Sequence, residues 1–358
     1  MSSALTDLCP LPIVQAPMAG GISVPPLTAA VSEAGGLGFL AGGYKTADGM
    51  YQEIKQLRSL TARPFGVNLF VPQPDTADAS AVDVYAHQLA GEAAWYETEL
   101  GDPDGGRDDG YEAKLAVLRD DPVPAVSFHF GCPPREVLES LARLGTRTLV
   151  TATTVEEALA VQYAGADAVI VQGVEAGGHR GTHRDNPETD GAGIGLLSLV
   201  AQVREAVHLP IVAAGGLMRG SQIAAVLAAG ASAAQLGTAF LATPESGAHP
   251  VHKQALTNPL FVRTELTRAF SGRPARGLVN RFLREHGPYA PAAYPQVHHL
   301  TQPLRQAAAR AGDAQGMALW AGQGHRMARE LPAGQLVEVL AAETASACAA
   351  LTQEGAGR

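Results

Sequence analysis

Short apolar runs recur along the first two thirds of the chain, and most are followed by a segment with helical periodicity or by a glycine-rich turn. The runs are apolar at nearly every position, which is typical of parallel strands covered on both faces. Eight such runs are present. We predict strands at residues 13–18, 37–41, 65–70, 125–130, 148–152, 168–172, 211–214 and 234–237.

Helical segments follow several of these runs, at residues 135–144, 154–163, 198–207 and 221–229. Thr154 is the predicted N-cap of the second segment, which carries Glu156 and Glu157 in its first turn and should end before Gly165. Strands that alternate with helices at this spacing indicate βα units. A (β/α)8 TIM barrel and a doubly wound sheet both fit, and the eight units favour the barrel.

Two regions interrupt this alternation. Residues 71–123 form a long insertion after strand three, with a predicted helix near 81–100, the turn GDPDGGRDDG and a second helix at 111–118. Residues from about 244 to 358 have the pattern of loops and helices. We expect one domain over residues 1–358, with the barrel core at about 10–243, the insertion at 71–123 and a C-terminal helical extension at 244–358.

Composition narrows the class of protein. The 358 residues are 46% hydrophobic and 17% charged, as in a globular protein. A net charge of -9 disfavours a nucleic-acid partner, which would need clustered Lys and Arg. The three cysteines, Cys9, Cys132 and Cys348, form no CxxC pair, so we expect a reducing cytoplasm. No signal peptide and no membrane-spanning run is evident, and the sequence leaves the oligomeric state open.

The most informative segment follows strand six and reads QGVEAGGHRG, residues 172–181. Active sites of these barrels form at the carboxyl ends of the strands. Four glycines would let the backbone approach a ligand closely, and His179 would face the pocket. The position of His179 in this loop fits a catalytic role and a loop histidine without a role equally well. His179 and His183 have metal-like spacing, but Gly181 argues against the helix that such a pair needs, so no metal is expected.

Glycine turns also follow strands seven and eight. Barrels often bind phosphate with these two loops. The backbone of Gly215, Gly216 and Gly237 would point N–H groups at the phosphate, and Thr238 would add its hydroxyl. Alternatively, these glycines only make tight turns.

Two amides sit in or at the end of apolar strands, Asn68 and Gln172. A buried amide without a partner costs about 1–3 kcal/mol, so either a ligand or a neighbouring backbone group should satisfy each one. Together they suit a heterocycle such as a flavin ring, with Ala16, Pro17 and Met18 as its apolar wall. His129 on strand four is a core or pocket-lining histidine. No base is evident for Cys132, and no GxSxG, GxxxxGK[ST] or clear GxGxxG motif is present.

Several motifs occur in the order found in a known family: QAPMAGG, GLGFLAGGYK, FGVNLF, SFHFGCP, QGVEAGGHRG, AAGGL and QLGTAFL. The chain resembles the nitronate monooxygenases, formerly called 2-nitropropane dioxygenases. FSGRPARGLVN and the stretch from YPQVHHLTQPLR to LWAGQG resemble their class I branch. The similarity covers nearly the whole chain, and the combination of EAGGHRG with GVNLF is its specific part.

The resemblance implies a barrel that binds FMN non-covalently, and His179 matches the active-site histidine of the family. It also implies that Tyr111, Lys114 and Tyr294 border the substrate. Arg219 lies where the pattern varies and carries no inference. The cofactor contacts expected from the strand ends and the resemblance together are Met18, Asn68, Gln172, Gly177, Gly215, Gly216, Gln235, Leu236, Gly237 and Thr238.

The activity that the resemblance implies is oxidation of alkyl nitronates with O2 to a carbonyl compound and nitrite, through a flavin semiquinone. Propionate 3-nitronate is the expected substrate. His179 would either hold the nitro oxygens or abstract the α-proton of a neutral nitroalkane. Three alternatives remain open: an FMN-dependent NADH:quinone or enoyl-thioester oxidoreductase, a non-redox barrel for a phosphorylated metabolite, and a binding protein without turnover.

Overall fold

Eight parallel strands form the centre of the computed structural model, which describes residues 7–189 and 193–356. Neighbouring strands follow the order β1-β9-β8-β6-β5-β4-β3-β2. A parallel bridge between Val14 and Leu37 closes the ring, with the N–H of Gln15 donating to the oxygen of Leu37 at 2.9 Å. The predicted (β/α)8 TIM barrel is therefore confirmed. Its strands are β1 Ile13–Gln15, β2 Gly38–Ala41, β3 Phe65–Phe70, β4 Ala125–His129, β5 Arg147–Ala152, β6 Ala168–Gln172, β8 Ile211–Ala214 and β9 Ala233–Leu236.

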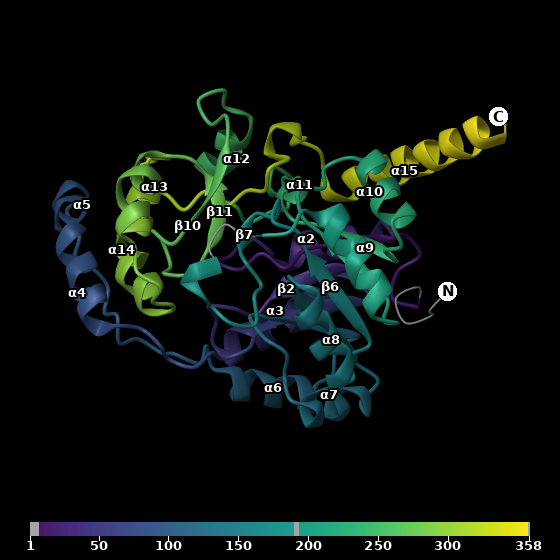
Figure 1. The fold of residues 1–358 in the computed structure, drawn as a ribbon, viewed down its shortest axis with the longest axis horizontal. Coiled ribbons are helices and arrows are strands. Elements are labelled where there is room, and N and C mark those ends of the chain that lie inside the picture. Colours follow the sequence, from purple (N-terminus) through teal and green to yellow (C-terminus); the bar gives the residue numbers. More distant parts are fainter. Residues whose placement is uncertain (1–6, 190–192, 357–358) are drawn as a thin grey trace.

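A ring of helices covers the outside of the barrel (Figure 1). Their starts follow local signals: the Thr154 side chain accepts from the N–H of Glu157, and the helix ends at Gly165, as predicted. The helices of the ring are α2 Pro25–Glu33, α3 Ala47–Leu60, α6 Tyr111–Asp120, α7 Arg135–Ala142, α8 Val155–Ala164, α9 Leu196–Ala206, α10 Gly220–Ala228 and α15 Ala333–Ala356.

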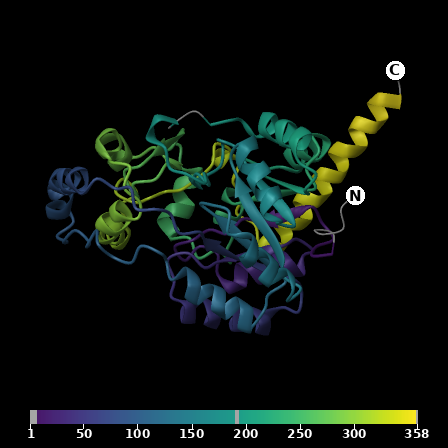
Figure 2. The same cartoon turned by 60° about the horizontal axis from the view of Figure 1, so that its bottom comes forward.

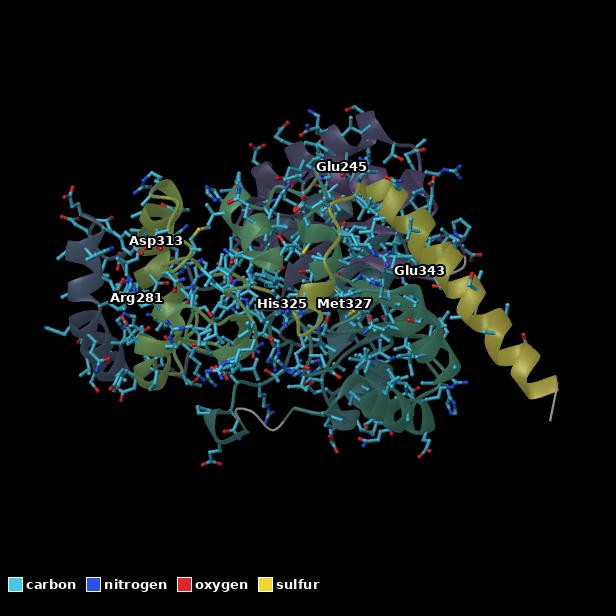
Figure 3. The ribbon with its side chains drawn as sticks, turned by 90° about the horizontal axis from the view of Figure 1, so that it is seen from above. Glu245, Arg281, Asp313, His325, Met327 and Glu343 are labelled. Carbon is cyan, nitrogen blue, oxygen red and sulfur yellow. The ribbon has the colours of Figure 1, made fainter. Side chains whose placement is uncertain are left out.

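The last helix of the ring comes from the far end of the chain. The first half of α15 packs between α10 and α2, and its Leu336, Val337 and Leu340 join the core outside the strands. Glu245 accepts the N–H of Ala333 at 3.0 Å, and Glu343 accepts that of Gly220 at 2.8 Å (Figure 3). The second half of α15 projects beyond the body of the barrel (Figure 2). The expected core at 10–243 therefore needs this helix to complete it.

The strands are mostly apolar because both of their faces are buried. On β6, Ile170 points into the barrel cluster that includes Val14, Phe39 and Val212. Its neighbours Val169 and Val171 belong to the larger cluster between strands and helices. Alternate residues thus fill the barrel and anchor the helices.

The insertion and the C-terminal region share a second core. Tyr85 and Leu89 pack with Phe282, Val297 and Leu304. In Figure 1 the insertion helices α4 (Ala79–Gln88) and α5 (Ala90–Trp95) lie beside α13 (Arg281–His286) and α14 (Gln296–Arg310), away from the barrel, whereas the third insertion helix, α6, belongs to the barrel ring. That the whole chain counts as one domain stays a prediction. The remaining helices are α4 Ala79–Gln88, α5 Ala90–Trp95, α11 Thr238–Leu241, α12 Pro250–Thr257, α13 Arg281–His286 and α14 Gln296–Arg310, with 3-10 turns η1 Pro187–Thr189, η2 Gly287–Tyr289 and η3 His325–Met327.

A small antiparallel sheet corrects the sequence interpretation of two regions. It joins β7 (Gly178–His179), β11 (Ala275–Leu278) and β10 (Thr264–Thr267), so the C-terminal region is not purely loops and helices. The segment with His179 is likewise part of a strand. These strands have two to four residues and no apolar alternation, so only their partners define them.

Within the described residues, every helix is too short or too polar to cross a membrane. The N-terminal residues 1–6, for which no signal peptide was expected, lie outside the described part.

Packing inside the barrel predicts a glycine requirement on β3. A Cβ at Gly66 would lie 2.1 Å from Cε1 of the fully buried Phe39, which is its register partner on β2. We expect Gly66→Ala to lower the free energy of unfolding by about 1–3 kcal/mol because the core must move apart. Urea unfolding measures this. Gly91→Ala on α5 is the matched control, since no atom lies within 4 Å of its added Cβ. Equal values for Gly66→Ala and wild type would contradict this packing.

Candidate active site

A cavity of about 1190 Å³, including space open to solvent, lies at the carboxyl ends of the barrel strands. This position is typical of active sites in such barrels. Every residue proposed from the sequence as a catalytic or cofactor residue lines it. These are Met18, Asn68, Gln172, Gly177, His179, Gly215, Gly216, Gln235, Leu236, Gly237 and Thr238.

Gln172 holds the segment that carries His179. Its Nε2 donates to the backbone oxygen of His179 at 3.1 Å, and its Oε1 accepts the N–H of Gly181 at 2.9 Å. The buried amide of Gln172 therefore has its hydrogen-bond partners within the protein, in the backbone of its own loop. Gly181 must be glycine here, since a Cβ would lie 2.6 Å from the ring of His129.

The imidazole of His179 is enclosed by residues from distant parts of the chain. Its Nε2 lies 2.8 Å from Oγ of Ser271. The rings of Phe130, Tyr294 and Trp320 have centroids 5.6, 5.8 and 5.7 Å from it. The side chain therefore has one polar neighbour and an aromatic surround.

Burial lowers the pKa of His179 to about 3, and the nearby charges of Arg273 and Arg305 and the ring of His129 act in the same direction. The imidazole is consequently neutral at neutral pH. It can accept a proton or a hydrogen bond, and it adds no positive charge to the free pocket.

Two polar side chains of the cavity keep unused capacity. The Nδ2 of Asn68 donates to Oγ and to the backbone oxygen of Ser127, at 2.9 and 3.2 Å. Gln235 Oε1 is buried and has no hydrogen-bond partner in the described structure. A buried acceptor left this way costs free energy unless a ligand supplies a donor.

The turns after β8 and β9 present unbonded backbone. No hydrogen bond to the described part of the chain comes from the N–H groups of Gly215, Gly216 or Gly237. Gly215 and Gly216 have φ of 141° and 68°, which side-chain-bearing residues rarely adopt. Thr238 Oγ1 accepts the N–H of Gly322 at 2.9 Å and keeps its own proton to donate. These groups follow adjacent strands and line the same cavity, as an anion cradle requires.

Three other residues were considered from the sequence: His129, Cys132 and His183. His129 lines the cavity and bonds Thr151 Oγ1 at 3.2 Å, while burial lowers its pKa to about 3. Burial raises the pKa of the Cys132 thiol to about 11, which argues against a nucleophile. His183 Nε2 contacts the backbone oxygen of Thr151, so it and His179 serve different partners.

Tyr111 and Lys114 do not border the cavity, contrary to expectation. Both are buried on α6, which is a barrel helix, and Lys114 pairs with Asp109 at 2.7 Å. Tyr294, in contrast, lies beside His179 and donates to the hydroxyl of Tyr44 at 3.2 Å.

The sequence did not reveal Ser271, Arg273, Trp320 or Tyr44. Ser271 lies 92 positions from His179, and only the pairing of β11 with β7 brings its loop close. The backbone of the folded protein marks two residues of this region. Tyr44 and Phe130 have positive φ angles of 63° and 71°, which are strained for side-chain-bearing residues and frequent at functional sites.

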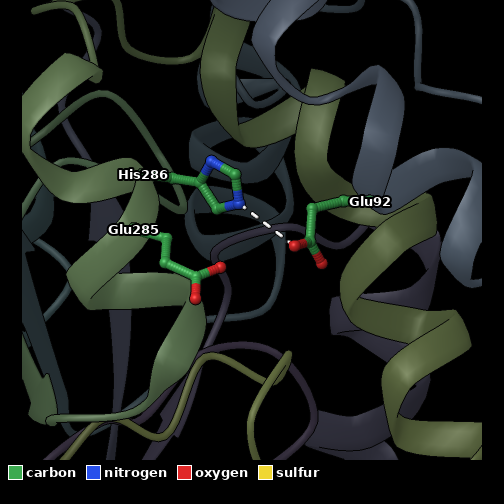
Figure 4. Close-up of side chains that lie close together, drawn as sticks. All are labelled: Glu92, Glu285 and His286. Atoms are coloured by element: carbon green, nitrogen blue, oxygen red, sulfur yellow. Dashed lines mark hydrogen bonds and ion pairs between the residues drawn. The ribbon is translucent and has the colours of Figure 1, made fainter.

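The described residues hold one group with metal-like spacing, made by Glu92, Glu285 and His286 far from the cavity (Figure 4). Arg281 donates to both carboxylate oxygens of Glu92 and also pairs with Glu285. The guanidinium thus occupies the position that a cation would need. This group joins α5 to α13 as an ion-pair network.

A barrel with an apolar cavity, free polar groups at its strand ends and a buried neutral histidine defines a class: an enzyme that acts on a small molecule. A family model described as nitronate monooxygenase matches residues 2–343. The chain belongs to the nitronate monooxygenase family, as its motifs indicated.

Individual relatives agree with this assignment. A nitronate monooxygenase from Pseudomonas aeruginosa is 44% identical over 347 residues, which cover 93% of this chain and 95% of that protein. One from Paraburkholderia phytofirmans is 40% identical over 93% of this chain and 92% of its own. A solved structure of nitroalkane oxidase from Streptomyces ansochromogenes is 81% identical, with a TM-score of 0.96, covering 98% of this chain and 100% of its own.

More distant structures share the architecture. FabK from Thermotoga maritima is 30% identical with a TM-score of 0.72, covering 98% of each chain. The enoyl reductase domain of MlnA from Bacillus amyloliquefaciens, at 12% identity and a TM-score of 0.64, shows the fold alone.

Buried neutral histidines should make the protein acid-sensitive. Burial lowers the pKa of His252 to about 4, and its Nε2 donates to the backbone oxygen of Trp320 at 3.0 Å. The unfolded chain takes up a proton near pH 6.5, so stability is complete above that value and falls as the pH drops toward 4. We expect the free energy of unfolding to fall from pH 7 to pH 5.

His252→Gln, which retains a donor, is the informative variant. Its loss of stability per pH unit should be shallower than that of the wild type by up to about 1.4 kcal/mol. Urea unfolding at pH 7, 6 and 5 measures both slopes. Identical slopes would show that His252 is not buried as a neutral group.

Proposed function

We propose that the protein is an FMN-dependent nitronate monooxygenase, which oxidises alkyl nitronates, with propionate 3-nitronate as the substrate, to a carbonyl compound and nitrite with O2. The observation that carries the proposal is His179: a neutral imidazole beside Phe130 and Trp320, in a cavity that free polar groups at the barrel's strand ends also line. Family membership and the 81% identical nitroalkane oxidase support it.

The residues present fit FMN. Gln235 Oε1, the orphaned buried acceptor, and the amide of Asn68 would contact the ring edge, and Met18 would lie against its face. The free N–H groups of Gly216 and Gly237 would hold the phosphate together with the hydroxyl of Thr238. When bound, FMN supplies the electron acceptor and the centre that reacts with dioxygen.

The protein's own part is to position the substrate and to exclude water. Phe130 and Trp320 would cover the substrate, and the neutral His179 would approach its nitro end. A nitronate is already an anion, so His179 would only orient it. A neutral nitroalkane must first lose its α-proton, and a neutral imidazole can accept it.

The spectrum of the purified protein after incubation with FMN tests the cofactor. We expect a yellow protein with flavin absorbance and nitrite release from propionate 3-nitronate. A colourless protein would instead favour a non-redox barrel that binds a phosphorylated metabolite. Anaerobic addition of NADH tests the other alternative. Rapid bleaching of the flavin absorbance would favour an NADH:quinone or enoyl-thioester oxidoreductase over a nitronate monooxygenase.

His179→Asn separates proton transfer from anion positioning. We expect kcat/KM for a neutral nitroalkane to fall by about 10²-fold or more, and that for the nitronate by about tenfold or less, because only the nitroalkane needs a base. Nitrite release from both forms measures this.

His183→Asn is the matched control, since His183 lies four residues on and does not line the cavity. Equal losses with both substrate forms would exclude a base-specific role. Unchanged rates with both would remove His179 from the reaction.

A further inference from the structure

Two guanidinium groups lie close to His179, and neither pairs with a carboxylate in the described part of the chain. Arg273 is 1% exposed, and its Cζ sits 4.2 Å from the centroid of the Phe130 ring. Its Nη2 donates to Oγ1 of Thr182 at 3.1 Å, a neutral acceptor. The charge of Arg273 is therefore buried without an opposite charge.

Arg305 contacts His298, whose ring lies behind the cavity residue Tyr44. Its Nε donates to Oγ1 of Thr301 at 3.1 Å, and its Nη2 donates to the backbone oxygen of His298 at 2.8 Å. The ring of His298 stacks on Tyr44 at 4.1 Å, and Tyr44 lines the cavity. Arg305 is thus separated from the cavity by two stacked rings.

Two nearby carboxylates pair with other cations. Asp109 pairs with Lys114 at 2.7 Å, and Asp185 with Arg268 at 2.7 Å. Asp109 accepts the N–H of Tyr44 and is the acidic group that faces the tyrosines. Its charge is offset by Lys114. Glu157 also acts on Arg273, and its carboxylate accepts the N–H groups of Thr153 and His183 at 2.6 Å each.

The other titratable groups that line the cavity or contact its wall carry no charge at neutral pH. Burial lowers the pKa of His129, His179 and His298. It raises the pKa of Tyr44 to about 12 and that of Tyr294 well above its ordinary value. The charged groups that act on His179 are therefore Arg273 and Arg305, two arginines that do not line the cavity.

An unpaired buried charge is costly, so its persistence points to an opposite charge that arrives with a ligand. We propose that Arg273 and Arg305 are specificity-determining residues that make the pocket select a compact anion over its neutral counterpart, through their field and without contact. The inference rests on the proposed function for the identity of that anion, the nitronate, and deepens it by assigning the selection to these two residues.

Inorganic nitrate is a suitable probe, because it is a planar anion of similar shape to a nitronate group and is not turned over. Nitroethane is the neutral comparison. Isothermal titration calorimetry on the protein saturated with FMN measures both affinities. We expect Arg305→Gln to weaken nitrate binding on the order of tenfold and to change nitroethane binding much less.

Two variants on the same helix serve as controls. Arg305→Lys keeps the charge and should retain most of the nitrate affinity. Arg310→Gln removes an exposed charge from the last turn of α14 and should leave nitrate affinity unchanged. Equal nitrate affinity in Arg305→Gln and wild type would overturn the proposal, as would an equal loss for nitrate and nitroethane.

The wild type alone gives a second test that does not depend on the folding of a variant. Guanidinium charges persist at neutral pH, so nitrate affinity should be constant between pH 6 and pH 8.5. An affinity that falls as the pH rises through about 6.5 would assign the anion to a protonated histidine and overturn the proposal. Nitrite release tests the proposed function separately, since nitrate binding needs no turnover.

Discussion

The hydrogen bonds of the Gln172 amide connect the barrel to the chemistry it carries. One amide at the end of β6 takes a donor and an acceptor from the backbone of the His179 segment. That segment then pairs as β7 with β11, a strand almost one hundred residues later. Because a buried amide must find partners, this loop has little freedom, and the position of His179 follows from it.

The pocket is built from two parts with different physical characters. The barrel contributes backbone N–H groups and amides at its strand ends, which suit a polar cofactor. The insertion and the C-terminal region share a separate core. The C-terminal region contributes Trp320 to the cavity wall and places Tyr294 beside His179. The barrel helix ring itself is completed by α15, so the C-terminal region cannot be removed without exposing the barrel.

Burial decides the charge state of the whole site. It keeps three histidines neutral and two tyrosines protonated, while the guanidinium groups stay charged because their ordinary pKa is so high. Desolvation thus keeps His179 neutral, whereas Arg273 and Arg305 stay charged and act on it. A pocket of this kind discriminates by charge before any contact is made.

Sequence alone determined the barrel, because parallel strands buried on both faces are mostly apolar and recur with their helices. It also identified the strand-end residues, since the carboxyl ends of barrel strands meet at one place: Asn68, Gln172, Gly216 and Gln235 all line the cavity. The strands β7, β10 and β11 carry too little periodicity to be predicted. Ser271, Arg273 and Arg305 became neighbours of His179 only through tertiary pairing, because contacts between residues so far apart leave no local pattern in the chain.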